Sequence, residues 1–156
     1  MLVATLIRLL PLTALMLLLP AGVIKASGEE VKPFAISVSS IEISFKLDPR
    51  ITQGIYMGDR WVSPPTYSAV GEEKELTVEA RAQAFDARRR PTEISPQWIP
   101  ADPAMVTVSP DHGRQVKITV RRAGESKLKV MAQGYSRELS IKATVQSSGI
   151  QVEISQ

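Results

Sequence analysis

The chain has 156 residues, a formal net charge of +3, one histidine and no cysteine. Without cysteine there is neither a disulfide nor a thiolate metal site, so a domain of this size must be held by its apolar core alone. A single histidine, His112, also excludes a cluster of histidine ligands and any second base for a Ser-His-Asp arrangement.

Residues 1–26 have the order of a secretory signal: a basic start, an uncharged apolar run at 9–19, a helix breaker and then small residues. We expect cleavage after Ala26 and export to the periplasm or the cell surface. The alternative is a retained membrane anchor. Pro11 and Pro20 disfavour it, because a spanning helix needs about 20 apolar residues. We therefore expect no stable membrane span after cleavage.

Removal of this segment changes the interpretation of the charge. Arg8 and Lys25 leave with it, so 17 basic and 16 acidic residues remain, a formal charge of +1. A nucleic-acid binder usually shows a concentrated basic face that neutralises phosphates. The sequence after residue 26 contains no comparable concentration of basic residues, and we expect no nucleic-acid partner.

The segment 27–61 is predicted to be an N-terminal extension with one strand. Ile41, Ile43, Phe45 and Leu47 alternate with polar residues, and this period of two puts the apolar side chains on one face of a strand. Asp48 and Pro49 end the run. Residues 50–65 contain glycines and prolines together with Tyr56 and Trp61, and we interpret them as a connection that lies over the domain.

From residue 62 to 147, short alternating runs recur with turn-forming residues between them, which is typical of a sandwich or barrel. The runs are 66–69, 76–84, 95–99, 105–108, 116–120, 128–132 and 139–145. Helical periodicity is absent after the signal. The last alternation, within 148–156, predicts an edge strand beside residues 41–47, or a tail. The predicted fold class is all-β: a sandwich of about seven strands, the number that an immunoglobulin-like domain needs.

Several short segments carry a family resemblance. They are Val70-Gly71-Glu72-Glu73, Ser95-Pro96-Gln97-Trp98, Met105-Val106-Thr107-Val108-Ser109 and residues 123–130, together with the long strand from Leu76. In this order they resemble the bacterial immunoglobulin-like domain, group 2, over residues 62–147. The resemblance implies an immunoglobulin-like β-sandwich with Trp98 packed between the sheets. Residues 99–103 depart from the family, which commonly has serine or asparagine there.

Loop geometry predicts one binding surface. In an immunoglobulin sandwich, three of the loops between strands gather at one end. In this chain those loops and their borders supply arginines and one tyrosine: Arg88, Arg89, Arg90, Arg114, Tyr135 and Arg137. The guanidinium fork suits carboxylates and phosphates, so the set predicts contact with an anionic partner. The alternative is a solvated loop tip that discourages aggregation through strand edges.

The sequence offers no catalytic, metal-binding or cofactor-binding residue. It contains no phosphate loop, nucleophile elbow or helix-borne metal motif. Glu29-Glu30 and Glu72-Glu73 are adjacent pairs, whose side chains point to opposite faces of a strand and so do not converge. The pair of Asp111 and His112 stands among turn-forming residues, and we interpret it as an exposed turn.

Two functional hypotheses remain. The first is a non-catalytic exported module that binds a protein or an anionic polysaccharide of the cell envelope, or supports the envelope, through its loops and sheet edges. The second is an accessory subunit or inhibitor of an envelope enzyme, in which residues 48–65 insert into the partner.

Overall fold

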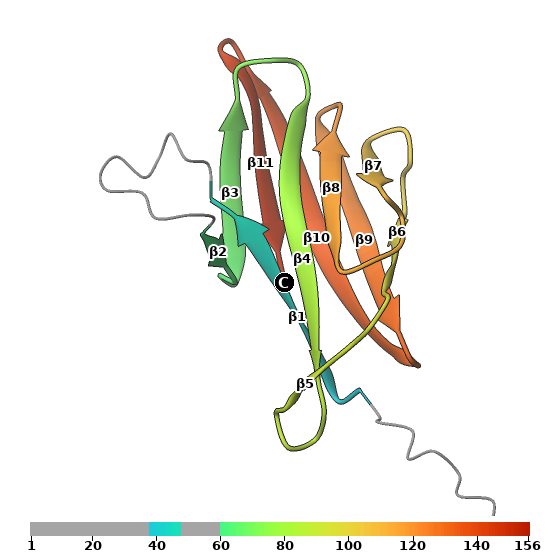
Figure 1. Ribbon diagram of the computed structural model, residues 1–156. Helices are drawn as coiled ribbons and strands as arrows, with labels where there is room; N and C mark the ends of the chain where they lie inside the picture. The colour runs from blue at the N-terminus through green and yellow to red at the C-terminus, as the bar shows by residue number, and fades with distance from the viewer. Residues whose placement is uncertain (1–37, 48–59) are drawn as a thin grey trace, which may run out of the picture. The chain divides into compact units, whose positions relative to one another are not determined.

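In the computed structural model, described here for residues 38–47 and 60–156, every regular element is a β-strand (Figure 1). Two antiparallel sheets face each other, which confirms the predicted all-β class. The predicted signal, residues 1–26, lies outside the described residues, as do residues 27–37 and 48–59 of the predicted extension and connection. No helix in the described part is long and apolar enough to cross a membrane.

The first sheet, called sheet A, has the strand order β2-β1-β4-β8-β7, with β5 paired to β4. Its strands are β1 (Ser40–Lys46), β2 (Trp61–Val62), β4 (Leu76–Phe85), β5 (Pro91–Thr92), β7 (Val106–Ser109) and β8 (Gln115–Val120). Sheet B has the order β3-β11-β10-β9-β6. Its strands are β3 (Thr66–Gly71), β6 (Gln97–Pro100), β9 (Gly124–Ala132), β10 (Tyr135–Gln146) and β11 (Gly149–Ser155).

The core forms between the inner faces of the two sheets, as the alternation predicts. In β4 the buried side chains are Val78 and three alanines, which are small enough for the opposite layer to pack closely. Trp98 fills the largest share of this space. It is 1% exposed, and its indole Nε1 donates a hydrogen bond to the carbonyl oxygen of Gly113 at 2.9 Å. The predicted core position of Trp98 is therefore confirmed.

Strand β1 is part of the sandwich, although the sequence analysis placed it in an extension before residue 62. It pairs along β4, and Ile41, Ile43 and Phe45 of its apolar face are fully buried. The Phe45 ring stacks on Tyr67 of sheet B with centroids 4.6 Å apart. Because this face needs an apolar layer to cover it, the strand docks on the core, and a boundary at 61/62 divides the folded unit.

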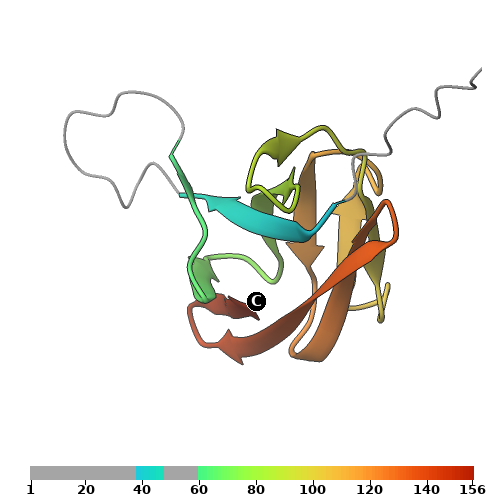
Figure 2. The same cartoon turned by 90° about the horizontal axis from the view of Figure 1, so that it is seen from below.

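Strand β11 also lies elsewhere than expected. It is not an edge strand beside β1 but an interior strand between β3 and β10, in the opposite layer (Figure 2). Its apolar side chains Ile150, Val152 and Ile154 are fully buried. At its start, Gly149 has a φ of 140°, and a Cβ there would lie 1.8 Å from the carbonyl oxygen of Gly71. Only glycine allows this approach between β11 and β3.

Candidate anion-binding surface

The β4–β5 loop, residues 86–90, is organised by one carboxylate. Asp86 Oδ1 accepts hydrogen bonds from the backbone N–H groups of Arg88 at 2.8 Å and Arg90 at 2.9 Å. Asp86 Oδ2 accepts a third from Arg90 Nε at 2.8 Å and lies 2.7 Å from Arg90 Nη2. Arg89 adopts the left-handed region at a φ of 58°. The loop therefore has a defined conformation, fixed from below by Asp86.

The same contacts set the charge of Asp86. The Arg90 backbone N–H, followed by the Arg90 side chain and the Arg88 N–H, lowers the pKa of Asp86 below its usual 3.8, against the opposing effect of desolvation. Hydrogen bonds to a carboxylate favour its charged form. The carboxylate thus stays ionised, and the loop keeps its support, at any pH above that value.

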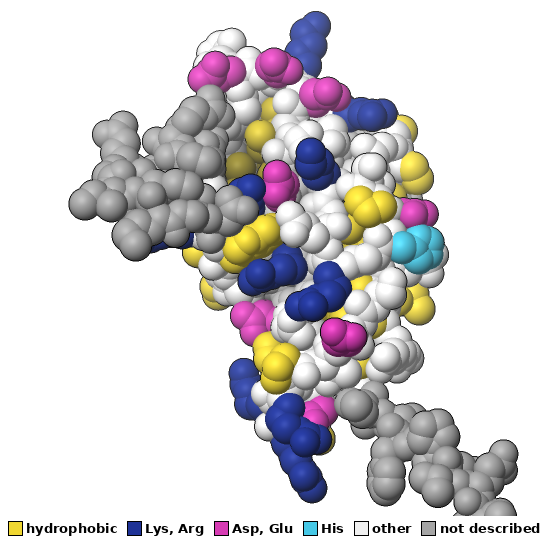
Figure 3. Space-filling view, viewed as in Figure 1, with side chains coloured by type: hydrophobic (Ala, Val, Ile, Leu, Met, Phe, Trp, Pro, Cys, Tyr) yellow, Lys and Arg dark blue, Asp and Glu magenta, His cyan; other side chains and the backbone are white. Residues whose placement is uncertain are grey.

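Arg88 and Arg89 are the free cations of this loop. Both are exposed, and within the described ranges their side chains make no hydrogen bond or ion pair. Lys and Arg side chains crowd the lower tip of the molecule in Figure 3. Two guanidinium groups are thus held on a rigid support and available to an anion.

The structure distributes the other predicted contact residues over different places. Arg114 follows the β7–β8 turn, and its Nη2 donates a hydrogen bond to Gln83 Oε1 on the outer face of sheet A. Tyr135 is half-buried and packs against the core. Arg137 points between the sheets, where its Nη1 donates to the carbonyl oxygen of Ile41 at 2.7 Å. The loop arginines and Arg114 therefore remain as surface cations, whereas Tyr135 and Arg137 support the fold.

The single histidine stands in an exposed pair. His112 Nδ1 lies 2.8 Å from Asp111 Oδ1, and the two side chains are 59% and 69% exposed. The hydrogen bond from His112 lowers the pKa of Asp111 below its usual value. Within residues 38–47 and 60–156 no group of three or more His, Cys, Asp or Glu side chains could hold a metal ion.

Sequence reasoning missed further cations on the outer face of sheet A. Lys46, Arg81 and Lys117 occupy outward positions of β1, β4 and β8. Lys46 lies 3.4 Å from Glu79, whereas the Arg81 guanidinium lies over the ring of Trp61, 4.8 Å from its centroid. The alternation that defines the core also predicts which residues point outward, and it could have shown that these cations share one face.

We call this surface the basic face. It consists of the outward side chains of β1, β4 and β8, Arg114, and the loop 86–90. Its cations are Lys46, Arg81, Arg88, Arg89, Arg90, Arg114 and Lys117, and its carboxylates are Glu42, Glu79 and Asp86, a balance of seven against three. Glu93 adds one exposed carboxylate next to β5 at its margin.

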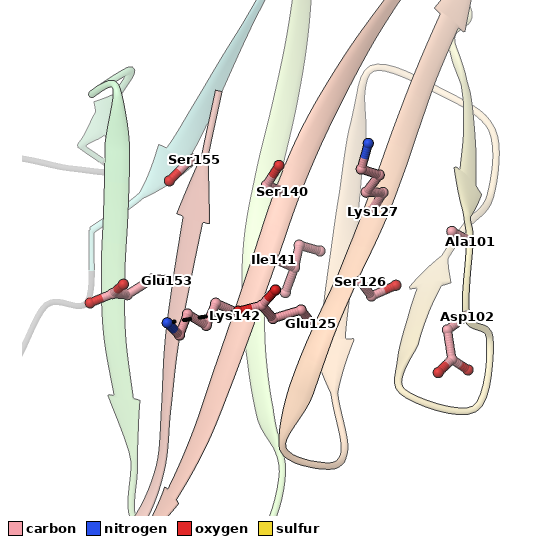
Figure 4. A pocket seen from close by; sticks show the side chains of 10 residues that line it. All are labelled: Ala101, Asp102, Glu125, Ser126, Lys127, Ser140, Ile141, Lys142, Glu153 and Ser155. Atoms are coloured by element: carbon pink, nitrogen blue, oxygen red, sulfur yellow. Dashed lines mark ion pairs between the residues drawn. The ribbon is translucent and has the colours of Figure 1, made fainter.

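The outer face of sheet B carries a shallow hollow of about 540 Å³ (Figure 4). Its lining includes Lys142 and Lys127, each of which faces a carboxylate. Lys142 Nζ lies 3.7 Å from Glu125 Oε1, and Lys127 Nζ lies 2.7 Å from Glu138 Oε1. The lysines of this hollow are therefore neutralised within their own sheet.

Comparison with known proteins adds no assignment to this geometry. No family model, no curated protein and no solved structure matches the chain. The resemblance to the bacterial immunoglobulin-like domain, group 2, therefore stays a prediction.

Proposed function

We propose that the chain is a non-catalytic, exported binding module of the cell envelope that holds an anionic partner through Arg88 and Arg89. The observation that carries this proposal is the loop built on Asp86. A carboxylate that accepts three hydrogen bonds fixes the backbone, while the two neighbouring guanidinium groups have no partner among the described residues. A loop whose backbone is already fixed loses less conformational entropy when its side chains bind a partner.

The proposed fold family is the bacterial immunoglobulin-like domain, group 2. The two facing antiparallel sheets and the burial of Trp98 between them support it. In such a sandwich the loops are displayed on a rigid framework, and binding residues are frequently found there. An exported domain without cysteine has no disulfide, so its apolar core must stabilise the fold alone. The continuous buried cluster between the two sheets is such a core.

The test is charge reversal of the loop in the purified protein. Arg88→Glu combined with Arg89→Glu is expected to weaken binding to immobilised polygalacturonate by about tenfold or more, since each exposed ion pair contributes up to about 1 kcal/mol and reversal adds repulsion. The matched control is Lys127→Glu with Lys129→Glu, which changes the net charge equally on sheet B. Unchanged binding of the Arg88 and Arg89 variant, with circular dichroism showing an intact fold, would contradict the proposal.

A further inference from the structure

Most cations of the basic face lack a carboxylate partner. Among residues 38–47 and 60–156, ion pairs on this face are formed by Lys46 with Glu79 and by Arg90 with Asp86 alone. Arg81 contacts an aromatic ring, and Arg114 binds a neutral amide. Lys117 is exposed, and in the described part of the chain its side chain has no hydrogen bond or ion pair. The face is therefore short of negative charge from its lower tip to the middle of sheet A.

The strand register arranges these cations in successive rows along β4. Lys117 pairs opposite Glu79, Arg81 lies two residues further along β4, and Arg114 reaches Gln83 two residues beyond that. With about 3.4 Å per residue, the rows from Glu79 to Phe85 cover about 20 Å, and the loop 86–90 continues from the end of β4. Figure 3 shows Lys and Arg side chains from the middle of this face down to the tip.

We propose that the anionic partner is a linear anionic polysaccharide that lies along the basic face, from the loop 86–90 across Arg114 and Arg81 to Lys117. The inference rests on the proposed function and deepens it by naming the partner class. A chain with an anionic group at regular intervals contacts several cations at once, and the linked contacts reinforce one another through a high effective concentration.

The groups between the cations fit a sugar chain. Ser44 and Gln115 occupy outward positions between the basic side chains, and their hydroxyl and amide groups can exchange hydrogen bonds with sugar hydroxyls. Gln83 is already engaged, since its Nε2 donates to the carbonyl oxygens of Ala84 and Thr92 and its Oε1 accepts from Arg114. A hollow of about 230 Å³ opens beside Lys117 and is also lined by Glu79, Ser109 and Gln115. This hollow offers room for a substituent of the chain between Lys117, which forms no ion pair among the described residues, and the Glu79 carboxylate.

A folded acidic protein fits the face less well. The core of a protein interface is usually rich in aromatic and other apolar side chains. Among the described residues, the large apolar side chains that are clearly exposed are Val70, Ile99, Met131 and Val145, and all four lie in strands of sheet B. The outer face of sheet A offers mainly charges, amides and hydroxyls, with the half-buried Trp61 ring covered by Arg81, and this composition suits a hydrated polymer.

The first test measures affinity against chain length. Oligogalacturonates of increasing length are titrated into the purified protein by calorimetry, beginning with the disaccharide. A track of successive cations predicts that affinity rises with length until the oligomer spans the face and then levels off. If the disaccharide binds as tightly as the long oligomers, the track is overturned, whereas the loop site of the proposed function stands.

The second test uses variants away from the loop. Arg114→Glu with Lys117→Glu is expected to weaken binding of long oligogalacturonates about tenfold while leaving the disaccharide unaffected, because only the long chain reaches these residues. Lys127→Glu with Lys129→Glu is the matched control on sheet B. Equal losses in both variants, or no loss in either, would overturn the track. Absence of any binding by the unmodified protein would overturn the proposed function together with it.

The third test fixes the class of the polymer. A phosphomannan provides phosphate groups and polygalacturonate provides carboxylates. Binding of either one, weakened by Arg114→Glu with Lys117→Glu, supports an anionic polysaccharide and identifies its anionic group. Single-stranded DNA and an acidic globular protein serve as competitors. If either of them binds more tightly than both polysaccharides and with the same dependence on the variants, the assignment to a polysaccharide is overturned.

Discussion

The two outer faces of this sandwich use charge differently. On sheet B, Lys127 and Lys142 each lie beside a glutamate, and the outward strand positions carry three lysines against three glutamates: Lys127, Lys129, Lys142, Glu125, Glu138 and Glu153. On the basic face of sheet A, Lys46 and Arg90 form ion pairs, whereas Arg81 lies over a ring and Arg114 binds an amide. The side chains of Arg88, Arg89 and Lys117 have no partner among the described residues. The fraction of charged residues does not reveal this contrast, because the two faces differ in how many of their cations form ion pairs with carboxylates.

The difference between the two faces separates charges that are paired within the fold from cations that are available to a ligand. An ion pair between exposed side chains contributes little to folding, so sheet B gains mainly solubility and register from its pairs. Exposed cations without any side-chain partner, such as Arg88, Arg89 and Lys117, gain no ion-pair stabilisation among the described residues and mildly repel one another. We propose that a ligand supplies the missing negative charge on this face.

The largest expected effect comes from removing the support of the basic face. Phe45→Ala should lower the free energy of unfolding by about 3–5 kcal/mol, because it empties a fully buried site where the ring stacks on Tyr67. Urea denaturation followed by circular dichroism measures the change. Glu42→Ala, on the outward side of the same strand, is the control and should change stability by less than about 0.5 kcal/mol. Similar values for both would mean that β1 is not docked on the core.

The next effect concerns the loop 86–90. The ionised Asp86 carboxylate accepts the loop's hydrogen bonds, and its lowered pKa means that this stabilisation is complete above pH 3.8, the usual value, and is lost as the pH falls through the folded-state pKa. In a pH titration followed by nuclear magnetic resonance, the amide signals of Arg88 and Arg90 should therefore shift with a midpoint below 3.8.

Asp86→Asn is the matched control for that titration. It should remove the pH-dependent shift and weaken polyanion binding severalfold, since Arg88 and Arg89 are then less well fixed. A midpoint at or above 3.8 in the unmodified protein would show that the arginines do not stabilise the carboxylate in solution.

A smaller effect is expected where the basic face uses a ring instead of an acid. The stacking of Arg81 on Trp61 should show a coupling energy of about 0.5–1 kcal/mol in a double-mutant cycle with alanine at both positions. Arg81→Lys keeps the charge but loses the planar contact, so it should recover only part of this coupling. Strictly additive losses in the free energy of unfolding would show that the ring does not hold the guanidinium.

The smallest effect belongs to sheet B. The pair of Lys127 and Glu138, with side chains 61% and 52% exposed, should give a coupling energy of about 0.5 kcal/mol that declines as salt is added. The longer pair of Lys142 and Glu125, at 3.7 Å, should give less. Coupling above about 2 kcal/mol, or coupling that salt leaves unchanged, would contradict the view that these pairs contribute little.

Local pattern was sufficient to predict much of the fold. The period of two in residues 76–84 and 139–145 identified strands and their buried faces, and Trp98 was predicted to lie in the core. Which strands pair with one another could not be predicted from the local pattern. Strands β1 and β11 were recognised as alternations, yet their places in sheets A and B depend on which distant apolar face each one covers, and no local signal encodes that choice.

The candidate site was predicted in part for a related reason. A run of arginines between two strands marks an exposed loop, and Arg88 and Arg89 are indeed exposed there. Arg137 was expected near them, but its register opposite Val130 turns it inward toward Ile41. The role of Asp86 was missed, although an aspartate that begins a turn is a known signal for hydrogen bonds to the following backbone N–H groups.

Binding of a polyanion to the basic face is tested most directly by mapping which backbone amides respond to the ligand. Backbone amide shifts of the isotope-labelled protein are recorded during titration with a long oligogalacturonate. We expect the shifted amides to belong to the loop 86–90 and to β4, β8 and β1. Shifts concentrated in β9, β10 and β11, on the face where lysines already have their glutamates, would contradict it.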